Sequence, residues 1–534
     1  MDRETNIESI RILEEEIKEH ERAAVRLKRA RNSLLNVSKL PPEVLGNIFR
    51  WNVIPNGDFD GLEMGSYNFL LVCHHWFEVA SRTPELWSFW GNTTKDWSRR
   101  YRRSGTAPLD LVLGEYGCNE RYFDDTLCGA LEDRAANDAI RRVHLLSGDA
   151  GLVGSILNAL TPNCEDLRSN GVESFILWNH GKVPADVSDF FAHYRFPKLQ
   201  RLNLVNCSVS SWDHLTSRTS VLTTLELELD RSSPTPTTSQ LLSILSSNPV
   251  LQKVALLRRA VPDDDGGDKL SSRVQLHHLK ELRLNGSLRH VFNLLQQLDH
   301  PRNMDLLSLT LFGCDDVGVS QVVGPHLRDH LQRRDRAQNG LSLSVSSGNH
   351  TYAIPHIAFS AGDAGGIDFS APTQSQMRTF VVVTMLLEGF SRDEQEKAAL
   401  GLIACVPREQ VVYFKTQTNP AGAEDMYAQF PNVRALSFDN VPLSAAFPNP
   451  NLAGDGRIFS SLEHVLLERV VMDYDGDWTP LVTFLACLMS SGNRLDTLVV
   501  ADSPLMFPEV VMSIRGLVRD LKINVSLLGA RPEP

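Results

Sequence analysis

The chain has 534 residues, of which 42% are hydrophobic and 22% are charged, and its formal net charge is -12. This composition is ordinary for a soluble protein, and the length predicts two or more domains or one long repeat array. The acidic balance argues against general binding to nucleic acid, because contact with a phosphate backbone requires a basic surface.

Cysteine usage and hydropathy point to a compartment. The eight cysteines are scattered, and no two of them form a CxxC pair. This fits buried thiols in a reducing compartment better than a disulfide framework or a zinc site. No apolar run approaches the roughly 20 residues that span a bilayer, and the first residues, "MDRETNIESIRILEEE", lack the apolar region of a signal peptide. We therefore expect a cytoplasmic or nuclear protein with no membrane partner.

Residues 4–36 predict one charged amphipathic helix. Its apolar residues recur at alternating steps of three and four, interrupted by His20 and Arg31: Ile10, Leu13, Ile17, Ala24, Leu27 and Leu34. A stripe this narrow fits a helix that packs on the next domain or stays in solvent, and it also fits a short coiled coil.

Residues 37–91 predict a small domain of three short helices. Prolines favour the first turn of a helix, and a run with several glycines favours a loop. The predicted elements are a helix that starts at Pro41 and Pro42, a loop at 53–66, a helix over Tyr67–Ala80, and a third helix that Thr83 caps ahead of Pro84. Three short helices cannot bury all of this apolar surface, which indicates a binding partner.

Two stretches of this region, "LPPEVLGNIF" from residue 40 and "FLLVCHHWFEVASRTPELW" from residue 69, carry a family resemblance. In order, they resemble the F-box, the module by which substrate receptors dock on the Skp adaptor of cullin–RING ubiquitin ligases. With the charged helix ahead of it, the region is similar to F-box proteins of the fungal, mushroom-type kind. The resemblance implies that a Skp-type adaptor contacts Leu40, Pro41, Pro42, Glu43, Val44, Leu45, Ile48, Phe49, Leu70, Leu71, Val72, Cys73, Trp76, Leu86 and Trp87.

Residues 107–534 carry a repeated pattern, apolar-x-x-apolar-x-apolar. Its ten copies are spaced by 23 to 33 residues, apart from one gap of 127, and they begin at Ile140, Val172, Leu199, Leu222, Leu251, Leu279, Leu306, Val433, Leu462 and Leu495. The gap has room for about three degenerate units, with strands near residues 341, 380 and 411. Helical stretches lie between the strands. The period predicts an α/β solenoid, a horseshoe with leucine-rich-repeat-like units, and an ordinary α/β domain is the alternative.

The junction between these regions holds two further features. We interpret "RRYRR" at residues 99–103 as a face that joins two domains, with a nucleic-acid contact as the alternative. The alternation "LDLVL" at 109–113 predicts the first strand of the array. An exposed strand edge invites unwanted pairing, so we expect the helix of residues 4–36 to cover it.

The sequence predicts no catalytic residue, metal site or cofactor. The acidic turns "VPDDDGGDKL" and "VMDYDGDW" do not match an EF-hand loop, and "GDAGLVGS" lacks the spacing of a phosphate-binding loop. The adjacent pairs at residues 74–75 and 277–278 are histidines whose side chains point apart on a helix or strand, which disfavours a shared metal.

Two classes of non-enzymatic function therefore remain. In the first, the chain is the substrate-recognition adaptor of a Skp–cullin–F-box ubiquitin ligase, and the solenoid binds a protein substrate of unknown identity. In the second, the repeats form a scaffold that binds another protein without recruiting a ligase. Binding to a Skp-type adaptor separates the two classes.

Overall fold

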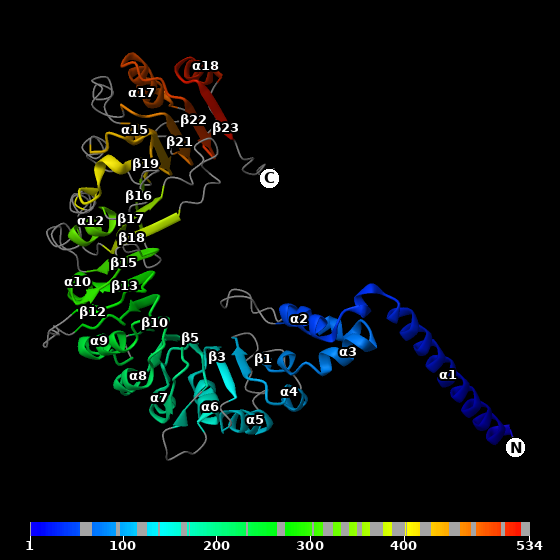
Figure 1. Cartoon of the computed structure of the whole chain (residues 1–534). Coiled ribbons are helices and arrows are strands. Elements are labelled where there is room, and N and C mark those ends of the chain that lie inside the picture. The colour runs from blue at the N-terminus through cyan, green and yellow to red at the C-terminus, as the bar shows by residue number, and fades with distance from the viewer. Residues whose placement is uncertain are drawn as a thin grey trace. The chain divides into compact units, whose positions relative to one another are not determined.

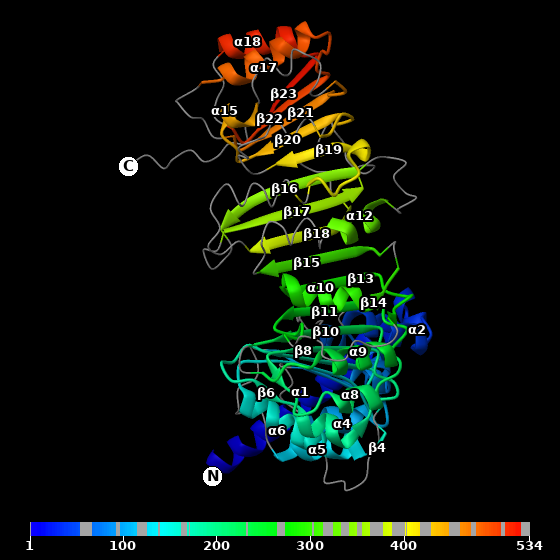
Figure 2. The same ribbon diagram turned by 90° about the vertical axis from the view of Figure 1, so that its left-hand side faces the viewer.

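Most of the chain is a mixed α/β structure built around parallel β-strands (Figures 1 and 2). It divides into a first unit, Met1–Val221 with Ser232–Pro234, and a second unit, Leu222–Arg231 with Thr235–Pro534. The division falls inside the predicted repeat region. The computed structural model describes residues 2–53, 67–91, 97–114, 125–136, 139–161, 168–169, 171–230, 233–263, 273–301, 304–312, 324–332, 341–349, 355–363, 378–386, 401, 403–416, 429–447, 460–470, 477–503 and 508–524.

The first unit begins with one long helix, α1 (Asp2–Ser33), which confirms the helix predicted over 4–36 (Figure 1). Residues 6–31 of this helix are exposed, with the single exception of the half-buried Ala23. Its apolar stripe therefore has no cover among the described residues of the chain.

A module of short helices follows α1. It contains η1 (Asn36–Lys39), α2 (Pro42–Val53), η3 (Tyr67–Leu71), α3 (His74–Ser81) and η4 (Pro84–Leu86). Residues 54–66, most of the predicted loop, lie outside the described residues.

The predicted proline start of the first helix is confirmed, but the single helix over Tyr67–Ala80 is wrong. The backbone is extended at Cys73, whose Sγ accepts a hydrogen bond from the N–H of Trp76, so this residue caps a new helix. The predicted N-cap position of Thr83 ahead of Pro84 is confirmed, but its hydroxyl makes no cap hydrogen bond and instead donates to the carbonyl of Val79 at 2.8 Å.

Five parallel strands of the first unit pair in chain order. They are β1 (Phe89–Gly91), β2 (Leu109–Leu113), β3 (Ile140–Ser147), β5 (Ser174–Asn179) and β8 (Arg201–Val205). The helices between and after them are α4 (Trp97–Ser104), α5 (Asp125–Ala136), α6 (Ala150–Leu160), α7 (Ser188–His193) and α8 (Asp213–Arg218). Figure 1 shows α5, α6 and α7 on one side of these strands. Two short pairs complete the unit: β4 (Arg168–Ser169) with β7 (Tyr194–Arg195), and β6 (Ala185–Asp186) with β9 (Cys207–Ser208).

Strand β1 overturns the expectation that the N-terminal helix covers the edge of residues 109–113. β1 follows η4 almost directly and pairs with β2 in parallel, and the N–H of Asp110 donates to the carbonyl of Ser88 at 2.9 Å. The edge is satisfied by backbone from the preceding module, so α1 is not needed there.

The second unit also begins and ends with parallel strands. The first four are β10 (Thr224–Leu229), β11 (Lys253–Arg258), β13 (Glu281–Ser287) and β15 (Leu306–Phe312). The last five are β19 (Val411–Thr416), β20 (Ala435–Asp439), β21 (His464–Glu468), β22 (Thr497–Ala501) and β23 (Asp520–Asn524). The helices are α9 (Thr238–Ser247), α10 (Leu288–Gln296), α12 (Gly324–Gln332), η10 (Arg408–Gln410), α15 (Leu443–Ala446), α17 (Thr479–Ser490) and α18 (Pro508–Leu517). A short pair joins β12 (Val274–Gln275) to β14 (Leu298–Asp299).

The strands between β15 and β19 depart from the repeat. Strands near 341, 380 and 411 are confirmed as β16 (Leu341–Asn349), β18 (Arg378–Leu386) and β19, but the sequence did not predict β17 (Pro355–Asp363). The spatial order is β15, β18, β17, β16, β19, and β17 is antiparallel to both neighbours (Figure 2). Only residues 350–354 separate β16 from β17, and a parallel crossover needs a dozen or more residues, so the chain turns back on itself.

The repeated pattern marks the buried strand positions. The pattern predicts that Leu202, Leu225, Leu282 and Leu309 are buried strand residues, and all four are buried. In nine of the ten copies every apolar residue of the pattern is buried. The exception is the copy that starts at Leu306, which is half-buried. Leu282 of β13 pairs with Leu307, so this copy is Met304, Leu307 and Leu309, shifted by two residues from its predicted position.

A left-handed residue recurs at one place in these copies. Five described non-glycine residues have positive φ: Asn206, Arg258, Asn440, Arg469 and Asp502. Each lies two residues after the third apolar position of its copy, directly after a strand or at its last residue. The same backbone turn is thus made at the end of five different strands, which is the geometry expected of a structural repeat.

We expect Asn440→Val to lower the free energy of unfolding by about 1–2 kcal/mol, because φ is 58° at this position and a branched Cβ is strained there. Asn440→Gly should be neutral or stabilising, since glycine adopts this conformation freely. Urea denaturation of the full chain measures both variants. Equal stability of the valine and glycine variants would contradict the assigned backbone.

Candidate functional site

The N-terminal module, residues 36–91, has its own apolar core. Its buried members come from α2, η3, α3, η4 and the residue after η4: Leu45, Phe49, Val53, Phe69, Val79, Ala80, Leu86 and Trp87. Phe49 stacks on Phe69 with ring centroids 4.5 Å apart, and Trp76 packs against Phe49 at 5.2 Å. The indole N–H of Trp87 donates to the carbonyl of Ala80 at 2.8 Å, which ties the end of α3 to η4. This core holds α2, η3, α3 and η4 together.

The residues that the resemblance assigns to adaptor binding divide into three groups by burial. Leu45, Phe49, Leu86 and Trp87 are buried in the core, so they position the module and offer little side-chain surface to a partner. The half-buried group is Leu40, Leu70, Cys73 and Trp76, and the exposed group is Pro41, Pro42, Glu43, Val44, Ile48, Leu71 and Val72.

The exposed apolar residues of α2 form one face. This face consists of Val44, Ile48 and Trp51, and Trp51 is 71% exposed. Residues at i, i+4 and i+7 lie on one side of a helix, and we call these three residues the α2 face. Sequence reasoning missed Trp51, although this spacing from Val44 and Ile48 would have identified it. None of these three side chains belongs to the core of the module, so their apolar surface is exposed to water and available to a partner.

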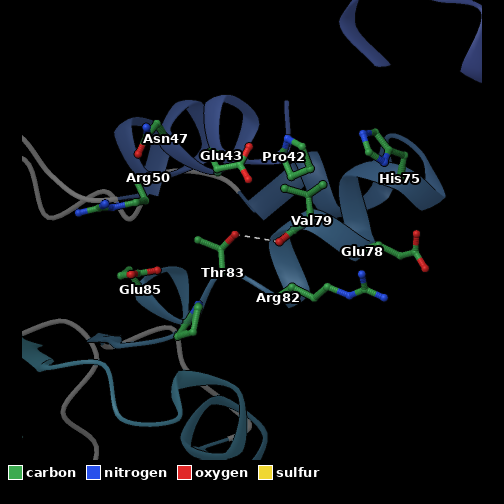
Figure 3. A pocket seen from close by; sticks show the side chains of 12 residues that line it. Pro42, Glu43, Asn47, Arg50, His75, Glu78, Val79, Arg82, Thr83 and Glu85 are labelled. Carbon is green, nitrogen blue, oxygen red and sulfur yellow. Dashed lines mark hydrogen bonds between the residues drawn. The ribbon is translucent and has the colours of Figure 1, made fainter. Parts of the chain in front are cut away.

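A groove of about 420 Å³ lies between α2, α3 and η4 (Figure 3). Its charged lining has both signs: Glu43, Arg50, Glu78, Arg82 and Glu85. His75 and Arg50 each place a buried nitrogen, Nε2 and Nε respectively, that makes no hydrogen bond within the described part of the chain. Both nitrogens are shielded from solvent, so the polar surface that the groove offers to a partner comes from its exposed charged residues, Glu43, Glu78, Arg82 and Glu85.

The basic stretch at residues 99–103 lies against the same module. The guanidinium of Arg100 lies 4.7 Å from the ring centroid of Tyr67, and that of Arg103 lies 4.3 Å from the ring of Trp87. Cation–π contacts of this kind favour arginine over lysine. These two arginines join α4 to the module, and both parts belong to the first unit.

Tyr67 is a half-buried polar residue at this junction. Its hydroxyl donates to the carbonyl of Leu86 at 3.1 Å and accepts from Arg100 Nη1 at 3.1 Å. Burial raises the pKa of Tyr67 above its ordinary value of 10.0, although Arg100 opposes the shift. The folded state therefore holds this proton more tightly than the unfolded state, and the associated stability is present below pH 10 and is lost as the pH rises through the folded pKa.

We expect Tyr67→Phe to lower the free energy of unfolding by about 1 kcal/mol at neutral pH, through loss of the hydroxyl hydrogen bonds. The difference between wild type and variant should shrink above pH 10, because only the wild type has this proton to lose. Urea denaturation at several pH values measures it. A difference that stays constant across pH would contradict the assigned environment of Tyr67.

Rows of charged side chains on the strands of the second unit are another candidate surface. Lys253 Nζ lies 2.8 Å from an oxygen of Glu226 and 3.7 Å from one of Glu281, and Lys415 Nζ lies 3.0 Å from Glu468. These ion pairs cross from strand to strand. They leave a surface of mixed charge there, unlike the apolar α2 face.

Other kinds of site have no geometric support in the described residues. No group of three or more histidine, cysteine, aspartate or glutamate side chains is placed to hold a metal ion within those ranges. Among the helices described, none combines the length and apolar character needed to cross a membrane.

No model of a known protein family matches the chain, and no curated protein matches it. The N-terminal module and the repeated strands are therefore the features of the chain that indicate a function.

Proposed function

We propose that this chain is the substrate-recognition adaptor of a Skp–cullin–F-box ubiquitin ligase. The observation that carries the proposal is the exposed α2 face, Val44, Ile48 and Trp51, on a module whose core is already complete. Tryptophan is enriched among the residues that dominate binding energy at protein interfaces. An F-box that binds a Skp-type adaptor requires a surface of this kind, and the order of the motif residues supports the same assignment.

The module divides its apolar residues between two tasks. Core residues such as Phe49 and Trp87 hold the short helices together, while Ile48 and Trp51 remain available to a partner. Leu71, the last residue of η3, and Val72, which follows it, are exposed as well. Burying such side chains against an adaptor contributes about 1.5–3 kcal/mol each for full burial.

The repeated strands are the proposed substrate-binding part. The common register of their buried leucines and the left-handed turn after five strands support an array of leucine-rich-repeat-like units, interrupted by β16–β18. Such arrays present long surfaces to protein partners. In this proposal the chain performs no bond chemistry. The linked ligase supplies it, and the chain raises the local concentration of a protein substrate.

Co-purification tests the proposal. An immobilised Skp-type adaptor should retain the full chain, and a chain that lacks residues 1–91 should not be retained, with its fold verified by circular dichroism. Retention of both forms would contradict docking through the module. Failure to retain the folded full chain would favour the alternative, a scaffold that uses the repeats without ligase recruitment.

A further inference from the structure

The apolar stripe, defined by Ile10, Leu13, Ile17, Ala24 and Leu27 of α1 and by Leu34 directly after its end, is not used by the proposed function. The helix has 32 residues and spans roughly 48 Å at 1.5 Å per residue. Its large apolar residues are exposed in the described chain, and the strand edge that it was expected to cover is paired with β1 instead. A single helix with an uncovered stripe is only marginally stable in water, so a partner for it is expected.

The charges of α1 are segregated along its length. Residues 2–21 contain eight acidic and three basic side chains, whereas residues 22–33 contain five basic and no acidic side chains. Two parallel copies would place like charges side by side. Two antiparallel copies place the acidic half of each helix beside the basic half of the other, so the helix is complementary to itself in one orientation.

We propose that α1 pairs with α1 of a second copy of this chain as a short antiparallel coiled coil. A register that places Ile17 opposite Leu27 also places Ile10 opposite Leu34, so two of the four distinct layers pair apolar residues. The other two layers set Leu13 against Arg31 and Ala24 against His20. In this register Glu14 lies beside Lys28 of the second copy, and symmetry makes that contact twice. The polar stripe residues His20 and Arg31 lower the stability but restrict the register.

The charge pattern also argues against other occupants of the stripe. An anionic membrane surface attracts helices whose polar face is basic throughout, and the first 20 residues of α1 are mainly acidic. A second copy of α1 provides complementary charge to both halves of the helix and also covers its apolar stripe. This inference does not depend on adaptor binding, because α1 and the α2 face are different surfaces.

Sedimentation equilibrium of the full chain at low salt tests the pairing. We expect a reversible dimer, and Ile17→Asn should weaken self-association at least roughly tenfold, as loss of a seam residue does. Ile12→Asn is the matched control, since Ile12 is 50% exposed against 56% for Ile17 on the same helix but lies outside the stripe. A wild-type monomer at all concentrations, or equal weakening by both variants, would overturn the proposal.

A charge-exchange series tests the orientation in the same assay. Glu14→Lys and Lys28→Glu should each weaken the dimer by roughly threefold to tenfold, because each change replaces two attractive contacts by repulsive ones. The double variant Glu14→Lys/Lys28→Glu should regain wild-type affinity in the antiparallel register. In a parallel pair these positions do not meet, so a double variant as weak as the two single changes combined would exclude the antiparallel arrangement.

Discussion

Replacing Phe175 with alanine is expected to lower the free energy of unfolding of the first unit by about 3–5 kcal/mol. Phe175 is fully buried in β5, its ring stacks on Phe190 with centroids 4.8 Å apart, and it meets Phe191 edge-on at 5.5 Å. Alanine would leave a cavity that rigid neighbouring rings cannot fill. Urea denaturation followed by tryptophan fluorescence measures the loss, because Trp178 lies on the same strand.

Phe312→Ala is the matched control for this prediction. Phe312 is the last residue of β15 and is 41% exposed, so the same truncation should cost well under 1 kcal/mol. If the two variants lose similar stability, Phe175 does not sit in the aromatic core described above.

Replacing Ile48 with aspartate and Trp51 with alanine together is expected to weaken binding to a Skp-type adaptor by at least roughly 100-fold, or about 3 kcal/mol. The double variant lacks the Trp51 side chain, and complex formation would bury the carboxylate introduced at position 48 without a partner. Both effects oppose complex formation. The free chain should remain folded because both side chains are exposed in it. Isothermal titration calorimetry measures the affinity, and thermal unfolding verifies the fold.

Val183→Asp is the matched control for that pair. Val183 is an exposed valine of the first unit outside the module, and the change adds the same charge. Weaker binding by this variant as well would mean that added acid, rather than loss of the α2 face, reduces affinity.

The strands of the repeat could be predicted from the sequence because each one carries its own local signal. Three apolar residues at fixed spacing must point into one core, and the strands that begin at Ile140, Glu281 and Thr497 lie where the pattern placed them. The copy at β15 was shifted by two residues, because this stretch matches the pattern twice, once from Met304 and once from Leu306. Only the pairing of Leu282 with Leu307 fixes its register.

The order of β16, β17 and β18 could not be predicted, because pairing between distant strands leaves no local pattern. Nothing in "LSLSVSSGN" indicates that an antiparallel neighbour follows. The short separation of β16 from β17 indicates antiparallel pairing, but only when both strands have been predicted.

The site was predicted by family pattern, which does not separate core from surface. Val44 and Leu45 are neighbours in one motif, yet the first is exposed and the second is buried. The difference is a rotation of about 100° around the helix per residue, and only packing against η3 and α3 decides which side faces inward. Trp51 lay outside the motif and was missed for the same reason.

In the proposed function, the α2 face docks this chain on a Skp-type adaptor. The most direct test is calorimetric titration of a purified adaptor into the full-length wild type, the Ile48→Asp/Trp51→Ala variant and Val183→Asp. We predict saturable binding of one adaptor per chain for the wild type and Val183→Asp, with affinity lost in the double variant. Absence of binding to the folded wild type, or equal affinity of all three proteins, would contradict docking of the adaptor on the α2 face.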